Sequence, residues 1–181
     1  MRLLRVLLCT GLMVLALPVH ALDGFSVDLG RGDESANLVN AALRWNWDTT
    51  WFTDGQWFVG GYWEANLGRW NGKNGKNRNG DITEIGITPV FRLQRHAPLD
   101  SGMMPFFEGS IGAHLISETS IGNRQLSTAF QLSESLAAGI RFGRKHQMEL
   151  SYRLQHFSNG GVKSPNSGMN FHMFRFGYNF E

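Results

Sequence analysis

Hydrophobic and polar residues alternate along eight segments of this chain. In residues 146–158, Met148, Leu150, Tyr152 and Leu154 share one parity, whereas the other parity is polar or charged. A period of two places successive side chains on opposite faces and therefore indicates a β-strand. The eight segments with this pattern are residues 24–30, 37–48, 57–70, 82–94, 104–116, 128–142, 146–158 and 169–180.

The two faces of these strands differ in a way that predicts a membrane barrel. One parity holds most of the Trp, Phe and Tyr residues. The other carries charges of both signs, and because buried charges need partners, we expect an interior network of ion pairs. A soluble lipocalin-like barrel would have the reverse arrangement, with its apolar residues inside. Segments of ~9–11 residues or more suit a tilted membrane crossing. The charged parity comprises Arg44, Glu64, Glu84, Arg92, Glu108, Arg141, Glu149, Arg153 and Arg175.

Composition and the chain ends agree with export to a bacterial outer membrane. Residues 1–21 have a basic start, an apolar run and a small-x-small cleavage site, which predicts a signal peptide cleaved after Ala21. Removal of Arg2 and Arg5 leaves equal numbers of basic and acidic residues, so no nucleic-acid partner is expected. Cys9 leaves with the signal. The remainder, residues 22–181, is predicted to be a single-domain, all-β, eight-stranded antiparallel transmembrane barrel.

The strand count also predicts an orientation. An even number of strands with both termini in the periplasm places the loops at 71–81, 117–126 and 159–168 outside, and the turns near 49–56, 95–102 and 143–146 inside. The end of the segment 146–158 therefore lies at the outer leaflet. His156 and Ser158 continue its apolar parity, so they should face lipid there.

A histidine and a serine that share a lipid-facing surface suggest an esterase with a lipid substrate, although ordinary polar decoration of the interface explains them equally well. A turn at 144–146 would pair Glu134 directly with His156, with Cβ atoms ~4.5–5.5 Å apart. An acid that faces lipid is costly and usually functional. A β-bulge that turns Glu134 inward is the alternative interpretation.

Further polar residues are candidates around this pair. Asn170 opens the last segment with outward parity, so it could orient the imidazole, but an amide cannot supply a charge. The residues Asn159, Gly160 and Gly161 could provide oxyanion donors, or form only a turn that leaves the strand. The third catalytic role is thus open between Glu134 and Asn170.

The chain resembles the lipid A 3-O-deacylase (PagL) family of Gram-negative outer membranes. The motifs that carry the resemblance are LRWNWD (43–48), GYWEA (61–65), TPVF (88–91), PFFEGSIG (105–112) and QHFSNGGVKSPNSG (155–168). The resemblance implies an eight-stranded barrel with a Ser-His-acid triad on its outer wall, which hydrolyses the 3-position acyl ester of lipid A in lipopolysaccharide without a cofactor. It assigns the nucleophile to Ser158 and the base to His156. The glutamate that the best-known member has at the start of the last strand corresponds to Asn170, which is a departure, and the strand-six acid of that member falls on Glu134.

These patterns lead to several expectations. Because a carboxylate stabilises an imidazolium and an amide only orients it, Glu134→Gln is expected to be more harmful than Asn170→Ala, and Asn170→Glu to be tolerated. No metal is expected, since only the histidines at 156 and 172 come close together. The rival hypotheses are a non-catalytic barrel (an adhesin or structural protein) and a phospholipase or acyltransferase with the same nucleophile. The sequence leaves acyl-chain preference and the choice between monomer and homodimer open.

Overall fold

A computed structural model describes residues 21–72 and 80–180 of the chain. The predicted signal peptide and most of the 71–81 loop fall outside these residues, so both stay predictions. Within the described ranges, no helix is long and apolar enough to cross a membrane.

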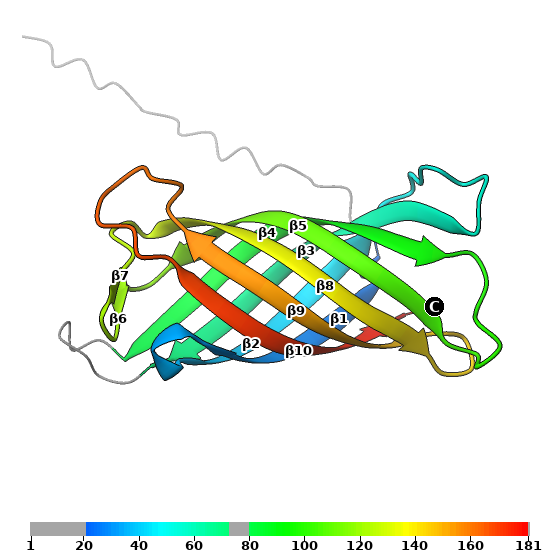
Figure 1. Cartoon of the computed structure of the whole chain (residues 1–181), viewed down its shortest axis with the longest axis horizontal. Coiled ribbons are helices and arrows are strands. Elements are labelled where there is room, and N and C mark those ends of the chain that lie inside the picture. Colours follow the sequence, from blue (N-terminus) through cyan, green and yellow to red (C-terminus); the bar gives the residue numbers. More distant parts are fainter. Residues whose placement is uncertain (1–20, 73–79, 181) are drawn as a thin grey trace, which may run out of the picture.

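Eight long antiparallel strands form one closed barrel, as predicted (Figure 1). Each strand pairs with its neighbour along the barrel, and the first strand closes the sheet by pairing with the last. A two-stranded hairpin and a short 3-10 helix lie at one end, with the 159–168 loop. We call this the outer end. The barrel strands are β1 (Gly24–Gly32), β2 (Asn37–Asn46), β3 (Trp57–Asn71), β4 (Asp81–Arg95), β5 (Met104–Ile116), β8 (Phe130–Phe142), β9 (Met148–Ser158) and β10 (Met169–Asn179); the additional elements are η1 (Asp33–Ser35), β6 (Ser120–Ile121) and β7 (Arg124–Gln125).

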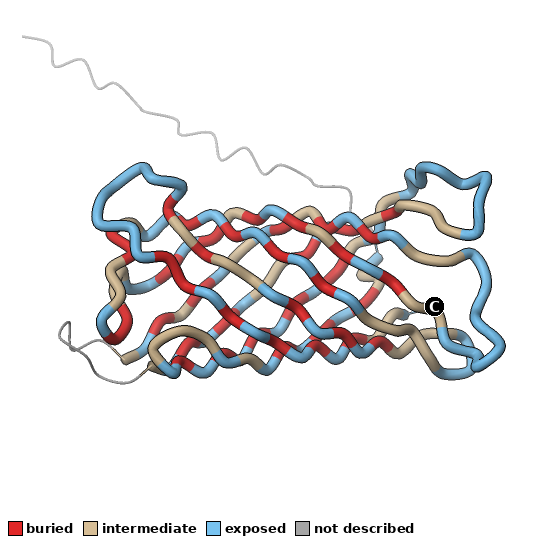
Figure 2. Tube along the Cα trace, in the orientation of Figure 1, coloured by how far each residue is buried: buried red, intermediate tan, exposed pale blue. Residues whose placement is uncertain are grey.

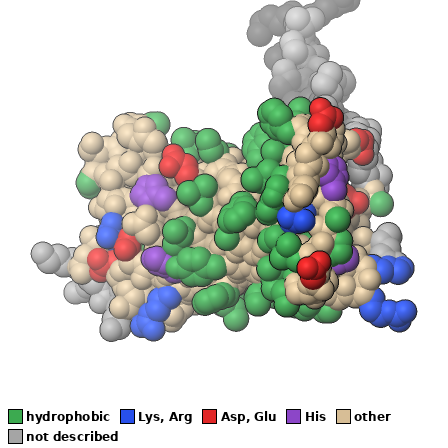
Figure 3. Space-filling view, turned by 45° about the vertical axis from the view of Figure 1, so that its right-hand side comes forward, with side chains coloured by type: hydrophobic (Ala, Val, Ile, Leu, Met, Phe, Trp, Pro, Cys, Tyr) green, Lys and Arg blue, Asp and Glu red, His purple; other side chains and the backbone are tan. Residues whose placement is uncertain are grey.

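The alternation along each strand appears as alternating buried and exposed residues (Figure 2). Trp63, Phe91 and Phe176 are 46%, 51% and 45% exposed on the outer wall, which confirms the predicted lipid-facing parity. Hydrophobic side chains cover much of the wall seen in Figure 3, and most charged side chains there gather toward its two ends. This is the surface that a hydrocarbon environment selects, because charges on the lipid face are most costly at mid-membrane depth.

The barrel interior holds the predicted ion network. Arg175 binds both Asp28 and Glu64, while Arg92 binds both Glu108 and Glu149. These six side chains are almost completely buried. The members are cross-linked through further pairs, so that each buried charge faces an opposite one. The same network also includes Arg44 and Arg153.

The outer part of the interior is apolar, which the parity analysis did not predict. Trp70 packs against Phe157 and Phe171, with ring centroids 4.7 and 5.0 Å apart. Phe157 points inward between His156 and Ser158, which point outward. This apolar plug anchors the outer end of β9 from the inside. Its members are Ala36, Leu38, Trp70, Ile82, Ile116, Ile121, Leu126, Phe157, Met169, Phe171 and Met173.

The interior network predicts a large stability effect for one substitution. Arg175→Met keeps much of the side-chain volume but removes the arginine partner of the buried Asp28. An uncompensated buried charge typically costs about 3–5 kcal/mol. We expect urea unfolding in detergent to show a loss of this size.

The matched control is Arg69→Met, which breaks the Arg69–Asp81 pair on the surface, where both side chains are about half exposed. Exposed pairs contribute at most about 1 kcal/mol. Equal losses for the two variants would contradict the assignment of the interior network as a stabilising unit.

Candidate active site

The register of three strands brings the predicted site residues into one row. His156 on β9 is paired with Glu134 on β8 and with Asn170 on β10. The predicted pairing of Glu134 with His156 is therefore confirmed, and no bulge turns Glu134 inward, since its side chain is exposed. His156 and Ser158 are both half-buried on the outward face at the end of β9.

Asn170 makes the hydrogen bond that orients the histidine. His156 Nδ1 lies 2.7 Å from Asn170 Oδ1. An amide oxygen only accepts, so the ring nitrogen that faces it carries the hydrogen. In the neutral imidazole, Nε2 is then the nitrogen without a hydrogen and can accept a proton from a hydroxyl group. The geometry gives His156 the tautomer that a general base requires.

Glu134 takes a different position from the one expected of a triad acid. Among the described residues, no hydrogen bond or ion pair joins its carboxylate to His156. It borders instead a groove of about 1180 Å³ on the outer wall, together with His156 and Asn170. The rest of the lining is largely apolar and includes Ile111 and Leu136. A largely apolar groove with a few polar groups at its margin suits a hydrocarbon chain.

The three predicted oxyanion donors make different hydrogen bonds in the loop that follows Ser158. Asn159 is fully buried, and its Nδ2 donates to two loop carbonyls, those of Leu126 at 2.9 Å and Lys163 at 2.7 Å. The Gly161 amide donates to Asn159 Oδ1 at 2.9 Å. These two residues therefore hold the loop together. The backbone amide of Gly160 lies 3.4 Å from Ser158 Oγ. Of the three predicted donors, Gly160 is therefore the one whose N–H faces the serine hydroxyl.

Ser158 and His156 lie two residues apart on one face of β9, and no hydrogen bond forms between their described side-chain atoms. Catalytic hydrogen bonds are often long or misaligned before substrate binds, so this spacing is compatible with a nucleophile and its base.

Gly168 limits the space around the imidazole. A Cβ atom at this position would lie 2.7 Å from His156 Cε1 and 3.2 Å from Nε2. Its φ of +62° also falls in the left-handed region that favours glycine. The end of the 159–168 loop thus packs against the Cε1–Nε2 edge of the ring.

The lipid A 3-O-deacylase (PagL) family model matches residues 38–179, which span most of the barrel and include the His156 row. The chain belongs to this family. Two curated relatives are the lipid A deacylases PagL of Pseudomonas aeruginosa, 25% identical over 80% of this chain and 79% of the relative, and of Bordetella bronchiseptica, 26% identical over 87% and 83%. The chain is accordingly a bacterial outer-membrane protein.

Solved structures agree on the fold of this PagL-family barrel. The crystal structure of the outer membrane enzyme PagL superposes with a TM-score of 0.77 and 24% identity, over 87% of this chain and 99% of that one. Neisserial surface protein A gives a TM-score of 0.52 at 9% identity, over 87% and 95%. Both likenesses support the barrel fold of this chain.

One residue beside the site was not anticipated from the sequence. Asp33 of η1 accepts hydrogen bonds from the Asn170 backbone and side chain, although 137 residues separate the two. The available signal was the closing strand pair: Gly32 is opposite Phe171, so the residue after Gly32 must lie near Asn170.

In the described ranges, no group of three His, Cys, Asp or Glu side chains is placed to hold a metal ion, and metal-free activity stays a prediction.

The contact of Gly168 with the imidazole predicts a loss of activity in Gly168→Ala. The added methyl would displace His156, and we expect deacylation of lipid A to fall at least about 100-fold, as misplacement of a catalytic group by 1 Å can. The measurement is fatty-acid release from lipid A in detergent micelles.

Gly102→Ala is the matched control. Gly102 has a similar φ of +76° but nothing within 4 Å of an added Cβ, so it carries the same backbone strain without a neighbour. Similar activity losses in both variants would show that strain, and not displacement of His156, is responsible.

Proposed function

We propose that this chain hydrolyses the ester-linked acyl chain at the 3-position of lipid A, with Ser158 as nucleophile and His156 as general base. Family membership supports the substrate. The observation that carries the proposal is the hydrogen bond from His156 to Asn170, which leaves Nε2 free as an acceptor on the lipid-facing wall beside Ser158.

The proposed reaction is an acyl transfer in two halves. His156 Nε2 accepts the Ser158 proton while Oγ attacks the ester carbonyl, and the oxyanion forms next to the Gly160 amide. The imidazolium then gives its proton to the leaving sugar hydroxyl, and the acyl group stays on Ser158. In the second half, Nε2 removes a proton from water, the water oxygen attacks the acyl-enzyme, and Ser158 recovers its hydrogen as the fatty acid departs.

The position of the pair suits a substrate that is itself part of the membrane. Ser158 and His156 lie at the outer end of β9 and on its lipid-facing side. Lipid A could therefore approach laterally in the outer leaflet, with its acyl chain along the apolar groove and its polar part near the loops. The ester would then lie at the polar boundary, where water is available for the second half of the reaction.

Within this proposal, Asn170 orients the base and Glu134 does not touch it. The ranking expected from sequence, with Glu134→Gln more harmful than Asn170→Ala, rested on the charge of a carboxylate and on a register that both residues satisfy. The hydrogen bond distinguishes them and supports Asn170. Glu134 borders the groove together with His156.

The first test removes the nucleophile or the base. Ser158→Ala and His156→Ala should each abolish lipid A deacylation, by several orders of magnitude, since groups that act as one unit fail together. Mass spectrometry of lipid A from expressing cells measures the loss of the 3-position chain. Ser101→Ala and His96→Ala, at the inner end, are the matched controls.

Retention of lipid A deacylation in Ser158→Ala would refute the site. Ser158-dependent cleavage of phospholipid, or acyl transfer to a second lipid, with lipid A unchanged, would refute the substrate and favour the phospholipase or acyltransferase alternatives.

The second test reverses the ranking expected from sequence. Asn170→Ala removes the partner that fixes the His156 tautomer, a loss that costs ~10⁴ in kcat in the best-studied triad. Glu134→Gln breaks no hydrogen bond of His156, so its effect should be much smaller and should appear mainly in KM. Steady-state kinetics in mixed micelles separate the two, and a larger kcat loss for Glu134→Gln would return the charge role to Glu134.

A further inference from the structure

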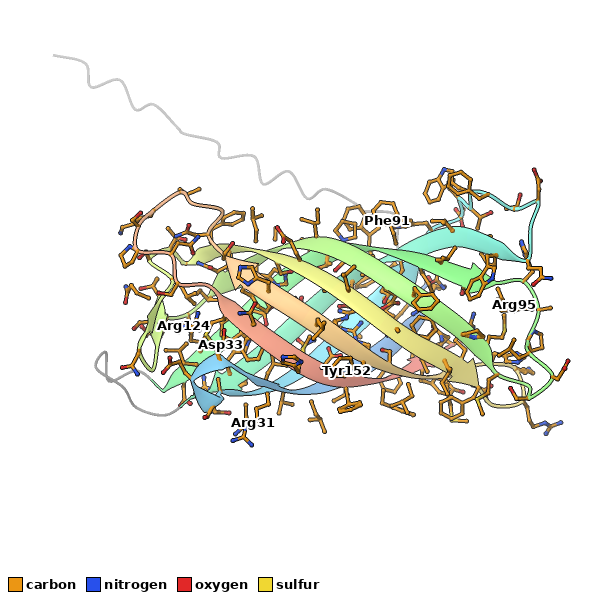
Figure 4. All side chains as sticks on the ribbon, viewed as in Figure 1. Arg31, Asp33, Phe91, Arg95, Arg124 and Tyr152 are labelled. Carbon is orange, nitrogen blue, oxygen red and sulfur yellow. The ribbon has the colours of Figure 1, made fainter. Side chains whose placement is uncertain are left out.

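The hydrogen-bonded row of the site continues past Asn170 to a carboxylate on another loop. Asp33 Oδ2 accepts the Asn170 side-chain Nδ2 at 2.9 Å and its backbone amide at 3.0 Å. Asn170 Oδ1 in turn faces His156 Nδ1. Figure 4 shows Asp33 at the outer end of the barrel, near Arg124.

This contact resolves an ambiguity that an asparagine brings to the site. An amide side chain has a donor end and an acceptor end, and rotation by half a turn exchanges them. If Nδ2 faced His156, the ring would have to accept at Nδ1 and carry its hydrogen at Nε2, which could no longer remove a proton from Ser158. A carboxylate is an acceptor only. Asp33 can therefore bind only the Nδ2 end, and this directs Oδ1 toward His156.

The carboxylate also brings charge to a site whose third member is neutral. A hydrogen bond that is donated to an anion polarises the amide and makes its oxygen a stronger acceptor. Asp33 thus adds part of the favourable electrostatics that a glutamate would give directly, one group farther from the imidazole.

Arg124 holds this arrangement in place from a third loop. One terminal guanidinium nitrogen lies 3.3 Å from Asp33 Oδ2, and the other donates to the Ser167 carbonyl at 2.8 Å. The same guanidinium group therefore ties η1 to the loop segment that ends with Gly168 against His156.

We propose that Asp33 is a positioning residue that fixes the orientation of the Asn170 amide and, through it, the reactive tautomer of His156. The proposal deepens the function above and rests on it for the role of the site. Asp33 and Asn170 act as one unit that replaces a single triad acid.

The direct test measures the tautomer of His156. Imidazole nitrogen chemical shifts, recorded by nuclear magnetic resonance on the folded barrel in micelles and assigned with His156→Ala, distinguish the Nδ1-protonated form from the Nε2-protonated form. Asp33→Ala should move His156 from the first form toward a mixture. Glu34→Ala should not, because Glu34 lies in the same turn and reaches Asn123 and Arg124, but no hydrogen bond joins it to Asn170 within the described residues. An unchanged His156 tautomer in Asp33→Ala would overturn the proposal.

Kinetics supply a second test with a change of background. In the natural chain, Asp33→Ala should lower kcat by about tenfold or more, the scale seen when a group that orients a metal-binding histidine is lost. In the Asn170→Glu background, a carboxylate contacts His156 directly and needs no orientation, while Asp33 would repel it. There, Asp33→Ala should cause no loss of activity and should restore any that Asn170→Glu has cost.

A residue that only supports the fold would lose activity in both backgrounds, and this result would refute the proposal. The proposed function and the role of Asp33 can be refuted separately. If Ser158→Ala keeps lipid A deacylation, the proposed function is wrong, although the tautomer measurement still tests Asp33. If Ser158→Ala is inactive while Asp33→Ala is fully active in the natural chain, only the role of Asp33 is wrong.

Discussion

Closure of the sheet is the constraint on which the rest of this molecule depends. In a bilayer, every strand amide and carbonyl needs a partner, and only a closed barrel provides one without an exposed edge. Here closure is made by the pairing of β1 with β10. The same pairing extends to the end of β1 and carries Asp33 to Asn170, across 137 residues of sequence. Barrel closure, which the membrane requires, thereby brings Asp33 from η1 and Asn170 from β10 into one polar row with His156 of β9.

The barrel interior beneath the row of Asp33, Asn170 and His156 is filled with packed side chains. Charged pairs fill the middle, and the apolar plug fills the outer part, below the site. Phe157 is 1% exposed inside the plug, and it separates His156 from Ser158 along the strand. Since neighbouring residues of a strand point to opposite faces, burial of Phe157 obliges both of its neighbours to face outward. Packing inside the barrel thus fixes the direction of reactive groups on its outer wall.

The sequence predicts those parts of the structure that follow from strand periodicity. The eight strands, the lipid-facing parity, the interior charges and the opposition of Glu134 to His156 all depend on a repeat of two and a short turn. Loop side chains follow no such repeat. Asn159 was a candidate oxyanion donor, yet its amide holds the loop together. The choice of Asn170 over Glu134 as the partner of His156 also depends on rotamers, which register alone does not determine.

If His156 and Ser158 act as proposed, the departure at Asn170 explains why a second residue is needed. A glutamate at this position would be an acceptor in every rotamer and would carry its own charge. An asparagine has neither property, because its two ends differ by one half-turn of the side chain and it is neutral. Orientation and charge must then come from outside the triad, and a carboxylate against the amide nitrogens can provide both. The structure places such a group at 2.9 Å from Asn170 Nδ2, in a turn whose position follows from barrel closure. On the proposed mechanism, the amide at position 170 and the acid at position 33 are two parts of one catalytic support, and a substitution of either one changes the requirement on the other.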